Sequence, residues 1–285
     1  MNSQPSEREN IYVLGSDPLE LARLDRQADW LEPATRLLLQ TAGIKPGLRV
    51  LDLGTGLGHV ARIAGELVGP GGSVVGVDRA VQPLDVARRR AEAAGERHLS
   101  FVEGDVGRWR TDEPFDAVVG RLVLFHLADP VSAVRHNIEN LAAGGMFVAI
   151  DYDLGSARAE PHVDLVDDAL EWVMRAFSAV GASPRIGARL GPILEQAGLE
   201  AVTTFGVQNY LPSRDPTGAA LLGGVVCSLA EPITRHGIAT AEQIGLATLE
   251  QRIADELRRK QAVVLPPTVV GAWGRRPGAS LDAHG

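Results

Sequence analysis

The feature that most constrains this chain is a glycine-rich turn that follows a short apolar run. Residues 50–53 read VLDL and predict a buried strand, and glycines follow at positions 54, 56 and 58. Glycine reaches positive φ and lets the backbone approach a ligand with no side chain in the way. The apolar spacing over residues 59–64 predicts a helix that begins at Gly58, so free N–H groups and the positive end of the helix dipole face the same point. Strand, turn and helix together predict a nucleotide-type site at the carboxyl end of a parallel strand.

The spacing of these glycines argues against a dinucleotide fingerprint. That fingerprint reads G-x-G-x-x-G, and its third glycine allows the helix to pack closely against the strand. In this chain the third glycine comes one residue early, and His59 stands where the fingerprint has Gly or Ala. Asp52 precedes the first glycine by two positions, so the run reads D-x-G-x-G-x-G.

Strand and helix patterns alternate over the next hundred residues. Helices are predicted over Leu84 to Ala94 and Pro130 to Leu141. β-Branched and apolar runs predict strands at residues 73–78, 99–105, 115–120 and 144–151. Strands that alternate with helices predict a right-handed, parallel, doubly wound α/β sheet.

The ordered segments VLDLGTGLG, VVGVD, VEGD, FDAVVGRLVLFHLADP and AAGGMFVAID resemble motifs I to V of class I S-adenosylmethionine-dependent methyltransferases, of the bacterial small-molecule type. The resemblance covers roughly residues 33 to 153. It implies a Rossmann-like, seven-stranded, mostly parallel sheet with helical N-terminal and C-terminal cap insertions. It places strand six at 201–207 and an antiparallel strand seven at 269–274. It also implies S-adenosyl-L-methionine as the cofactor and S-adenosyl-L-homocysteine as its product.

On this resemblance, acidic residues at the ends of strands two and three contact the adenosine. Asp78 would accept hydrogen bonds from the ribose hydroxyls, and Asp105 would accept one from the adenine amino group. Arg121, just beyond strand four, lies where family members contact the methionine part through the backbone. The full expected cofactor set is Asp52, Gly54, Thr55, Gly56, Gly58, Asp78, Arg79, Gly104, Asp105, Val106, Arg121, Tyr12 and Gln27.

Methyl transfer from a sulfonium requires a basic side chain of the protein only if the acceptor must lose a proton. The candidate bases are His126, after strand four, and Asp151, after strand five. Asp153, two residues on, would project to the same side if the strand continues. The alternatives are a structural histidine, and a loop or helix-capping carboxylate. Tyr152 could offer an aromatic face to the sulfonium or simply pack.

Two regions extend the predicted core, which spans residues 46–210 and 261–276. Residues 1–45 predict an N-terminal helical cap, split into two helices by Pro33. Residues 211–260 predict helices from Pro216 to His236 and from Thr240 to Lys260, which we interpret as a substrate lid. A dimerisation surface is the alternative for these helices, which leaves a homodimer open.

Composition narrows the classes of partner. Among 285 residues the net charge is −8, whereas nucleic-acid binding needs a basic surface. The single cysteine, Cys227 in the apolar run GGVVCSLA, predicts a buried, inert thiol and no cysteine-rich metal site. The histidines have no zinc-like spacing, so no metal is expected. With no signal peptide or membrane span recognised, the expectation is a cytoplasmic enzyme with a small-molecule substrate, in secondary metabolism.

Two other functions remain open from the sequence. One is a nicotinamide-dependent oxidoreductase on a similar sheet, because Asp78 would fit its ribose contact equally well. The other is a relative that binds S-adenosylmethionine without catalysis. The glycine spacing and Asp105 favour the methyltransferase. The acceptor atom, whether oxygen, nitrogen or carbon, carries no visible motif.

Overall fold

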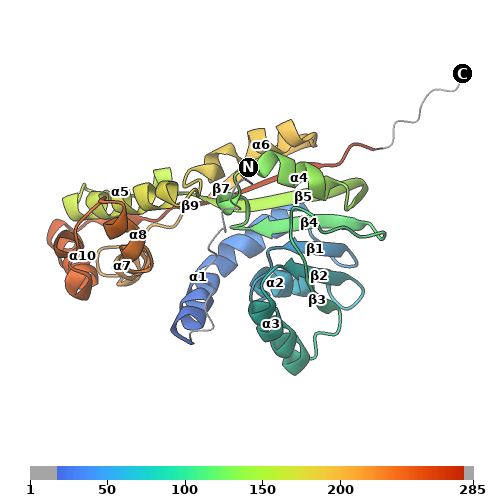
Figure 1. The fold of residues 1–285 in the computed structure, drawn as a ribbon, viewed down its shortest axis with the longest axis horizontal. Coiled ribbons are helices and arrows are strands. Elements are labelled where there is room, and N and C mark those ends of the chain that lie inside the picture. Colours follow the sequence, from blue (N-terminus) through green and yellow to red (C-terminus); the bar gives the residue numbers. More distant parts are fainter. Residues whose placement is uncertain (1–17, 279–285) are drawn as a thin grey trace, which may run out of the picture.

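The computed structural model describes residues 18–278, and Figure 1 shows their arrangement around a central sheet. Tyr12 lies outside the described residues. The sheet has seven strands in the order β3-β2-β1-β4-β5-β9-β7. Their bounds are β1 Arg49–Leu53, β2 Ser73–Asp78, β3 Leu99–Glu103, β4 Phe115–Arg121, β5 Leu141–Asp153, β7 Glu200–Val207 and β9 Thr268–Arg275. The first five strands of this order, β3, β2, β1, β4 and β5, pair with their neighbours in parallel. Strand β9 runs antiparallel to both β5 and β7. The predicted seven-stranded, mostly parallel sheet is therefore confirmed.

The register aligns the carboxyl ends of the parallel strands along one edge. Leu53 lies opposite Val77 on β2 and Gly120 on β4, and Asp78 lies opposite Glu103 on β3. The turns that follow these strands therefore meet at the same edge. In open α/β sheets this edge is where ligands bind.

Helices cover both faces of the sheet. The helices α1 (Pro18–Ala42), α2 (His59–Val68) and α3 (Val81–Ala94) share an apolar core with one face. The helices α4 (Pro130–Ile138) and α6 (Leu190–Ala197) pack on the other face. Figure 1 shows these two layers below and above the sheet.

Helix α1 differs from the prediction, because Pro33 lies inside one helix and does not split it. Apolar side chains on both sides of the proline, among them Leu31, Leu38 and Leu39, are buried against the sheet. Proline costs a helix a hydrogen bond and adds a steric clash. Burial of these leucines on a single face offsets that cost, since breaking the helix would move one group away from the core.

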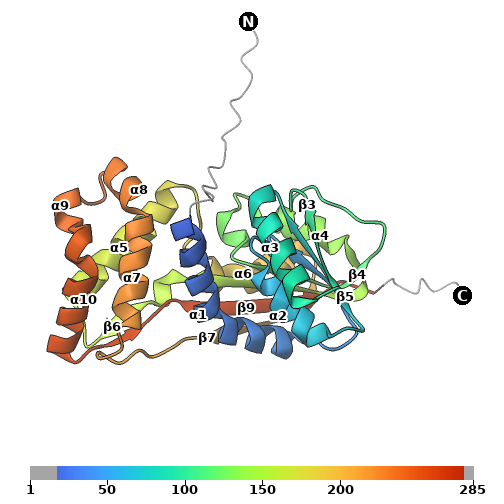
Figure 2. The same cartoon turned by 90° about the horizontal axis from the view of Figure 1, so that it is seen from below.

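A cap of helices lies beside the sheet (Figure 2). Its helices are α5 Asp164–Ala179, α7 Thr217–Ser228, α8 Ala230–Arg235, α9 Ala241–Ile244 and α10 Leu246–Lys260. A two-stranded ladder of β6 (Arg158–Glu160) and β8 (Val263–Leu265) joins the two chain segments that build the cap. The expected domain bounds place α5 with the core, whereas α5 packs against α7, α8 and α10.

The cap helices are shorter than the sequence predicts. The stretch 216–236 is divided into α7 and α8, and the stretch 240–260 is divided at Gly245, whose φ of 55° is left-handed. Cys227 is exposed, so the prediction of a buried thiol is wrong. Helix α7 turns Gly223 and Val226 inward and leaves the cysteine on its outer side. Among residues 18–278, no helix combines the length and apolarity needed to cross a membrane.

Candidate functional site

The turn after β1 has the geometry that its glycines predict. Gly54, Gly56 and Gly58 have φ values of 61°, 51° and 79°, a region that other residues rarely adopt. A Cβ on Gly54 would lie 2.7 Å from the Val123 side chain. A Cβ on Gly56 would have no heavy atom within 4 Å. The backbone at Gly56 therefore borders open space, which leaves room for a ligand at the start of α2.

Asp78 ties this turn to the end of β2. The Gly56 N–H donates to Asp78 Oδ2, and the Ala80 N–H donates to Oδ1, both at 2.9 Å. Each carboxylate oxygen keeps further acceptor capacity, because a carboxylate has about four lone-pair sites. These two hydrogen bonds from the backbone hold the carboxylate in place. Because the residue is 8% exposed, a small part of it remains accessible to a ligand.

The loop after β3 closes against the end of β2. The Gly104 N–H donates to the Asp78 carbonyl at 2.9 Å. A Cβ at Gly104 would lie 2.5 Å from the Trp109 ring, so this position needs glycine. Asp105 is exposed, and its Oδ1 accepts from the Gly107 N–H at 2.8 Å, while Val106 is half-buried. The structure thus brings Asp78, Gly104 and Asp105 to the edge where the glycine turn lies.

Asp52 is a buried carboxyl beneath the glycine turn. Its exposure is 1%, and Thr55 donates its hydroxyl to Oδ2 at 2.6 Å. Burial raises the pKa of Asp52 to about 7, against the opposing effects of the Thr55 hydrogen bond and of Arg121. The second oxygen, Oδ1, has no well-aligned hydrogen-bond partner among the described residues, although the backbone N–H of Ala61 also lowers the pKa of this carboxyl. A buried acceptor that is only partly satisfied fits a site that a polar ligand completes.

Arg121 and Tyr152 connect the ends of β4 and β5 to α1. Arg121 donates from Nη1 to the Thr35 hydroxyl at 2.9 Å. Burial raises the pKa of Tyr152 to about 12, although Arg121 and a hydrogen bond with Gln27 lower it. The structure therefore places Gln27 at Tyr152, near Arg121. Leu122, the next residue after β4, has a φ of 57°, a strained value of the kind that clusters at functional sites.

His126 lies in a 3₁₀ turn, η1 (Leu124–His126), that follows β4. His126 is exposed at the surface, but the surrounding protein removes part of the water around its ring. This desolvation, with a smaller effect of the positive charge of Arg79, lowers the pKa of His126. The ring is therefore neutral at pH 7, which is the form of histidine that can accept a proton.

Asp151 lies on β5 beneath the same turn, with 1% exposure. Burial raises the pKa of Asp151 well above its usual value, and the nearby backbone N–H groups of Phe125 and Leu124 oppose this only in part. Neither carboxyl oxygen has a well-aligned partner among the described residues. Asp153 caps the next turn by accepting from the Gly155 N–H at 3.0 Å. The two candidate bases thus lie around η1, one at the surface and one under it.

A further polar cluster at the start of α2 escaped the sequence analysis. His59 Nε2 and Asp25 Oδ1 are 2.9 Å apart, and Arg90 Nη2 donates to Asp25 Oδ2 at 2.8 Å. The hydrogen bond from Arg90 dominates in lowering the pKa of Asp25, and burial lowers that of His59. These residues come from α1, α2 and α3, and no local spacing links them. Only the departure of His59 from the dinucleotide fingerprint marks this place in the sequence.

Across residues 18–278, no three His, Cys, Asp or Glu side chains gather as a metal site would require. The sheet order, the glycine turn and the acidic strand ends define the Rossmann-like fold of class I methyltransferases. The chain belongs to the methyltransferase domain family, whose model matches residues 44–198.

Comparisons with known proteins agree with this family. The chain is similar to a demethylmenaquinone methyltransferase of Thermus thermophilus, with 36% identity over 43% of this chain and 54% of the relative. It is also similar to an arsenite methyltransferase of Halobacterium salinarum, with 30% identity over 56% of this chain and 39% of the relative. Among solved structures, the YcgJ protein of Bacillus subtilis matches with a TM-score of 0.55 and 18% identity, over 87% of this chain and all 100% of that chain. The matched region spans about half the length of these two curated relatives. The similarity to the YcgJ structure supports the fold of this chain only.

Proposed function

We propose that this chain transfers a methyl group from S-adenosylmethionine to a small-molecule acceptor. One observation carries the proposal: the left-handed turn at Gly56 borders open space and is hydrogen-bonded to Asp78 at 2.9 Å. Backbone N–H groups and a carboxylate are thus brought together where a parallel sheet binds nucleosides. The membership of the methyltransferase domain family supports the same reading.

The residues around this turn fit the cofactor. Gly54, Gly56 and Gly58 let the backbone lie close to it, and Asp78 accepts from the ribose. The loop at Gly104, Asp105 and Val106 receives the adenine. Asp52 and Thr55, with Arg121 and Gln27, form the polar surroundings of the methionine end. When bound, the cofactor supplies a methyl group on a positive sulfur that leaves as a neutral thioether.

For proton removal we propose His126 rather than Asp151, because of the opposite pKa shifts of the two groups. A neutral imidazole with a lowered pKa can accept a proton from an acceptor O–H or N–H at neutral pH. The Asp151 carboxyl is buried, and its raised pKa favours the protonated form, which cannot act as a base. Asp151 lies under the backbone of η1, where it supports the turn that carries His126.

The acceptor class follows from the cap and the charge. Helices beside the carboxyl edge of the sheet suit a small substrate that must be enclosed away from water, and the acidic net charge of −8 disfavours nucleic acid. Relatives named for demethylmenaquinone and arsenite act on small molecules, while others are named for protein L-isoaspartate. We place this chain with the small-molecule group, in secondary metabolism, with transfer to oxygen, nitrogen or carbon.

Calorimetry with S-adenosylmethionine, S-adenosylhomocysteine and NAD tests the cofactor. We expect both sulfur nucleosides to bind and NAD to give no heat. NAD binding without either sulfur nucleoside would point to an oxidoreductase and contradict the proposal. A mass-spectrometric screen for methylated acceptors then tests catalysis. Tight cofactor binding with no transfer to any acceptor class would indicate a non-catalytic relative.

A further inference from the structure

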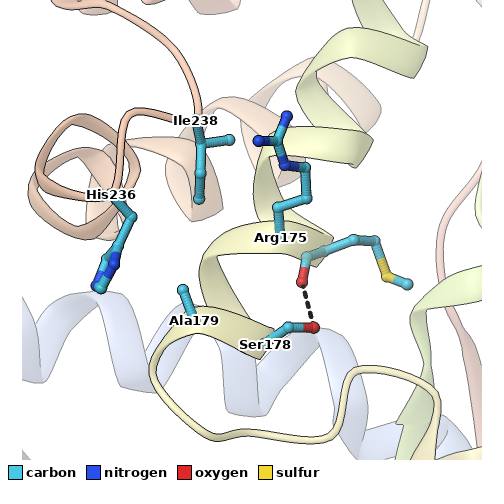
Figure 3. A pocket seen from close by; sticks show the side chains of 6 residues that line it. Arg175, Ser178, Ala179, His236 and Ile238 are labelled. Atoms are coloured by element: carbon cyan, nitrogen blue, oxygen red, sulfur yellow. Dashed lines mark hydrogen bonds between the residues drawn. The ribbon is translucent and has the colours of Figure 1, made fainter.

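The cap contains an open groove that the family resemblance does not assign. Its volume is about 550 Å³, and it is lined by Met174, Arg175, Ser178, Ala179, His236 and Ile238. Figure 3 shows the last turns of α5 on one side and the segment after α8 on the other. A groove of this volume is large enough for a small organic molecule.

Two aromatic contacts link the helix that lines the groove to the turn that carries the candidate base. Phe177, between the groove residues on α5, packs its ring edge against Phe125 with centroids 4.9 Å apart. Phe125 in turn contacts the neighbouring His126 ring at 5.0 Å. The loop after α5 is fastened to the same turn, because the Ser183 N–H donates to the Phe125 carbonyl at 2.9 Å. The end of α5 and the loop after it therefore pack directly against η1.

Among the lining residues that the structure describes, the one permanently charged group is the Arg175 guanidinium. Arg175 presents a guanidinium, and His236 adds an imidazole across from it (Figure 3). Ser178 already donates its hydroxyl to the Met174 carbonyl at 3.0 Å. No carboxylate lines the groove; Arg175 pairs with Glu171 at 3.4 Å, and the two side chains are 53% and 66% exposed. A long, solvated pair of this kind contributes little, so a ligand can replace it.

The remaining lining is apolar, from Met174, Ala179 and Ile238. We propose that this groove is the distal part of the acceptor site and binds an acceptor that carries a carboxylate. Arg175 holds the carboxylate through paired N–H groups, a geometry that a planar guanidinium favours. The apolar part of the acceptor lies along Met174 and Ile238, and its nucleophilic end reaches towards His126. This inference rests on the proposed methyltransferase function for the identity of the ligand.

Methionine NMR tests the groove without requiring turnover. The chain has three methionines; Met174 lines the groove, and Met146 is buried at 4% exposure. In protein labelled with ¹³C at the methionine methyls, Met174→Leu assigns the groove signal. The probes are three acids with their own primary amides: 4-hydroxybenzoate, indole-3-acetate and hexanoate.

At least one acid should shift the Met174 signal, with its amide binding at least ten-fold more weakly and the Met146 signal unmoved. Arg175→Ala should weaken acid binding about ten-fold, as expected for the loss of a charge-assisted pair. Arg258→Ala is the matched control, because Arg258 is also a half-exposed cap arginine, paired with Asp255 on its own helix. Equal shifts from acids and amides, no shift from any acid, or an unchanged affinity in Arg175→Ala would overturn the inference.

Cofactor binding separates the two proposals. If S-adenosylhomocysteine binds and wild type and Arg175→Ala methylate a carboxylate-bearing acceptor with the same KM, the groove assignment fails and the methyltransferase stands. If acids bind at Met174 but no sulfur nucleoside binds, the methyltransferase proposal fails instead. For a methylated acid, Arg175→Ala should raise KM about ten-fold and change kcat less than two-fold.

Discussion

At the scale of single residues, two buried carboxyl groups at the glycine turn have different surroundings. Asp78 is held by two backbone N–H groups, each at 2.9 Å. Asp52 has one well-aligned partner, the Thr55 hydroxyl on Oδ2, and no well-aligned partner on Oδ1 among the described residues. The first is held as a hydrogen-bond acceptor, and the second is near half-ionised at neutral pH because burial raises its pKa to about 7.

Asp78→Ala should weaken S-adenosylhomocysteine binding at least ten-fold. The change removes the proposed ribose acceptor and the partner of the Gly56 N–H, and a hydrogen bond to a charged group is worth about 1.5–3 kcal/mol. Calorimetry measures the affinity. Asp85→Ala, at an exposed position paired with Arg88 on α3, is the control and should leave it unchanged. Wild-type affinity in Asp78→Ala would remove Asp78 from the cofactor site.

Asp52→Asn should stabilise the protein increasingly as pH rises from 4 to 7. The folded pKa of about 7 lies above the usual aspartate value of 3.8, so the folded state binds more protons than the unfolded state in this window. In the wild type, the contribution of protonated Asp52 to the free energy of unfolding is therefore greatest below pH 4, and it is lost as the pH approaches 7. The difference between variant and wild type should grow by up to about 4 kcal/mol, at 1.36 kcal/mol per pH unit. Urea unfolding at several pH values measures it, and a pH-independent difference would contradict the buried, raised carboxyl.

His126 should titrate below its usual value near 6.5, because desolvation and the Arg79 charge both disfavour the imidazolium. Arg79→Met should move the pKa upward by removing the charge. NMR titration of the imidazole signal, identified by its loss in His126→Asn, checks both expectations. If the acceptor loses a proton to His126, the acid limb of kcat/KM should follow the same pKa and disappear in His126→Asn. A lower pKa of His126 in Arg79→Met than in wild type would show that the Arg79 charge does not act on this ring.

At the scale of elements, α1 is attached to the core in two ways. Its second half is buried through Leu31, Leu38 and Leu39, each at 0–1% exposure. Its first half is held by Asp25, which bonds His59 on α2 and Arg90 on α3. The first half therefore depends on polar contacts at the start of α2, beside the glycine turn.

Asp25→Ala should speed amide exchange in α1 before Leu31 and leave the part after it protected. The variant loses both polar contacts, while the buried leucines keep the second half in place. Hydrogen-exchange mass spectrometry resolves the two halves. Asp29→Ala, at an exposed position on the same helix, is the control. Equal exchange in Asp25→Ala and wild type would show that burial alone holds the helix.

The element scale also shows why some helices were predicted well and others were not. Helix α4 was expected from Pro130, and the structure begins it there, because Asp129 caps it by accepting from the Ser132 N–H at 2.9 Å. The break at Gly245 and the single helix through Pro33 were not predicted. Local propensity describes both positions poorly, since the outcome depends on which side chains the rest of the fold buries.

At the scale of the whole molecule, the core and the cap meet at an aromatic contact. Phe125 on η1 and Phe177 on α5 lie edge to face, with centroids 4.9 Å apart and ring planes at 89°. The turn that carries His126 and the helix that lines the groove therefore share one contact. We expect changes in the cap to reach the turn that carries His126 through these rings.

Phe177→Ala should destabilise the protein by about 2 kcal/mol, through lost burial and the lost edge-to-face contact. Exchange should rise in η1 and in residues 180–185, while S-adenosylhomocysteine affinity stays within two-fold. Denaturant unfolding, exchange and calorimetry measure these effects. Phe205→Ala removes a ring that is 44% exposed on β7 and is the control. A loss of cofactor affinity equal to that of Asp78→Ala would show that the cap contact supports the cofactor site directly.

The amino-acid sequence by itself determined the sheet and the cofactor edge. Alternating strand and helix patterns, left-handed glycines and acidic strand ends are local signals, written within a few residues of one another. The tertiary structure alone decided the ionisation of Asp52 and Asp151, the joining of Asp25, His59 and Arg90, and the packing of α5 into the cap. Burial, pKa and the pairing of distant side chains depend on what surrounds a residue in space, and neighbours in the sequence carry no record of it.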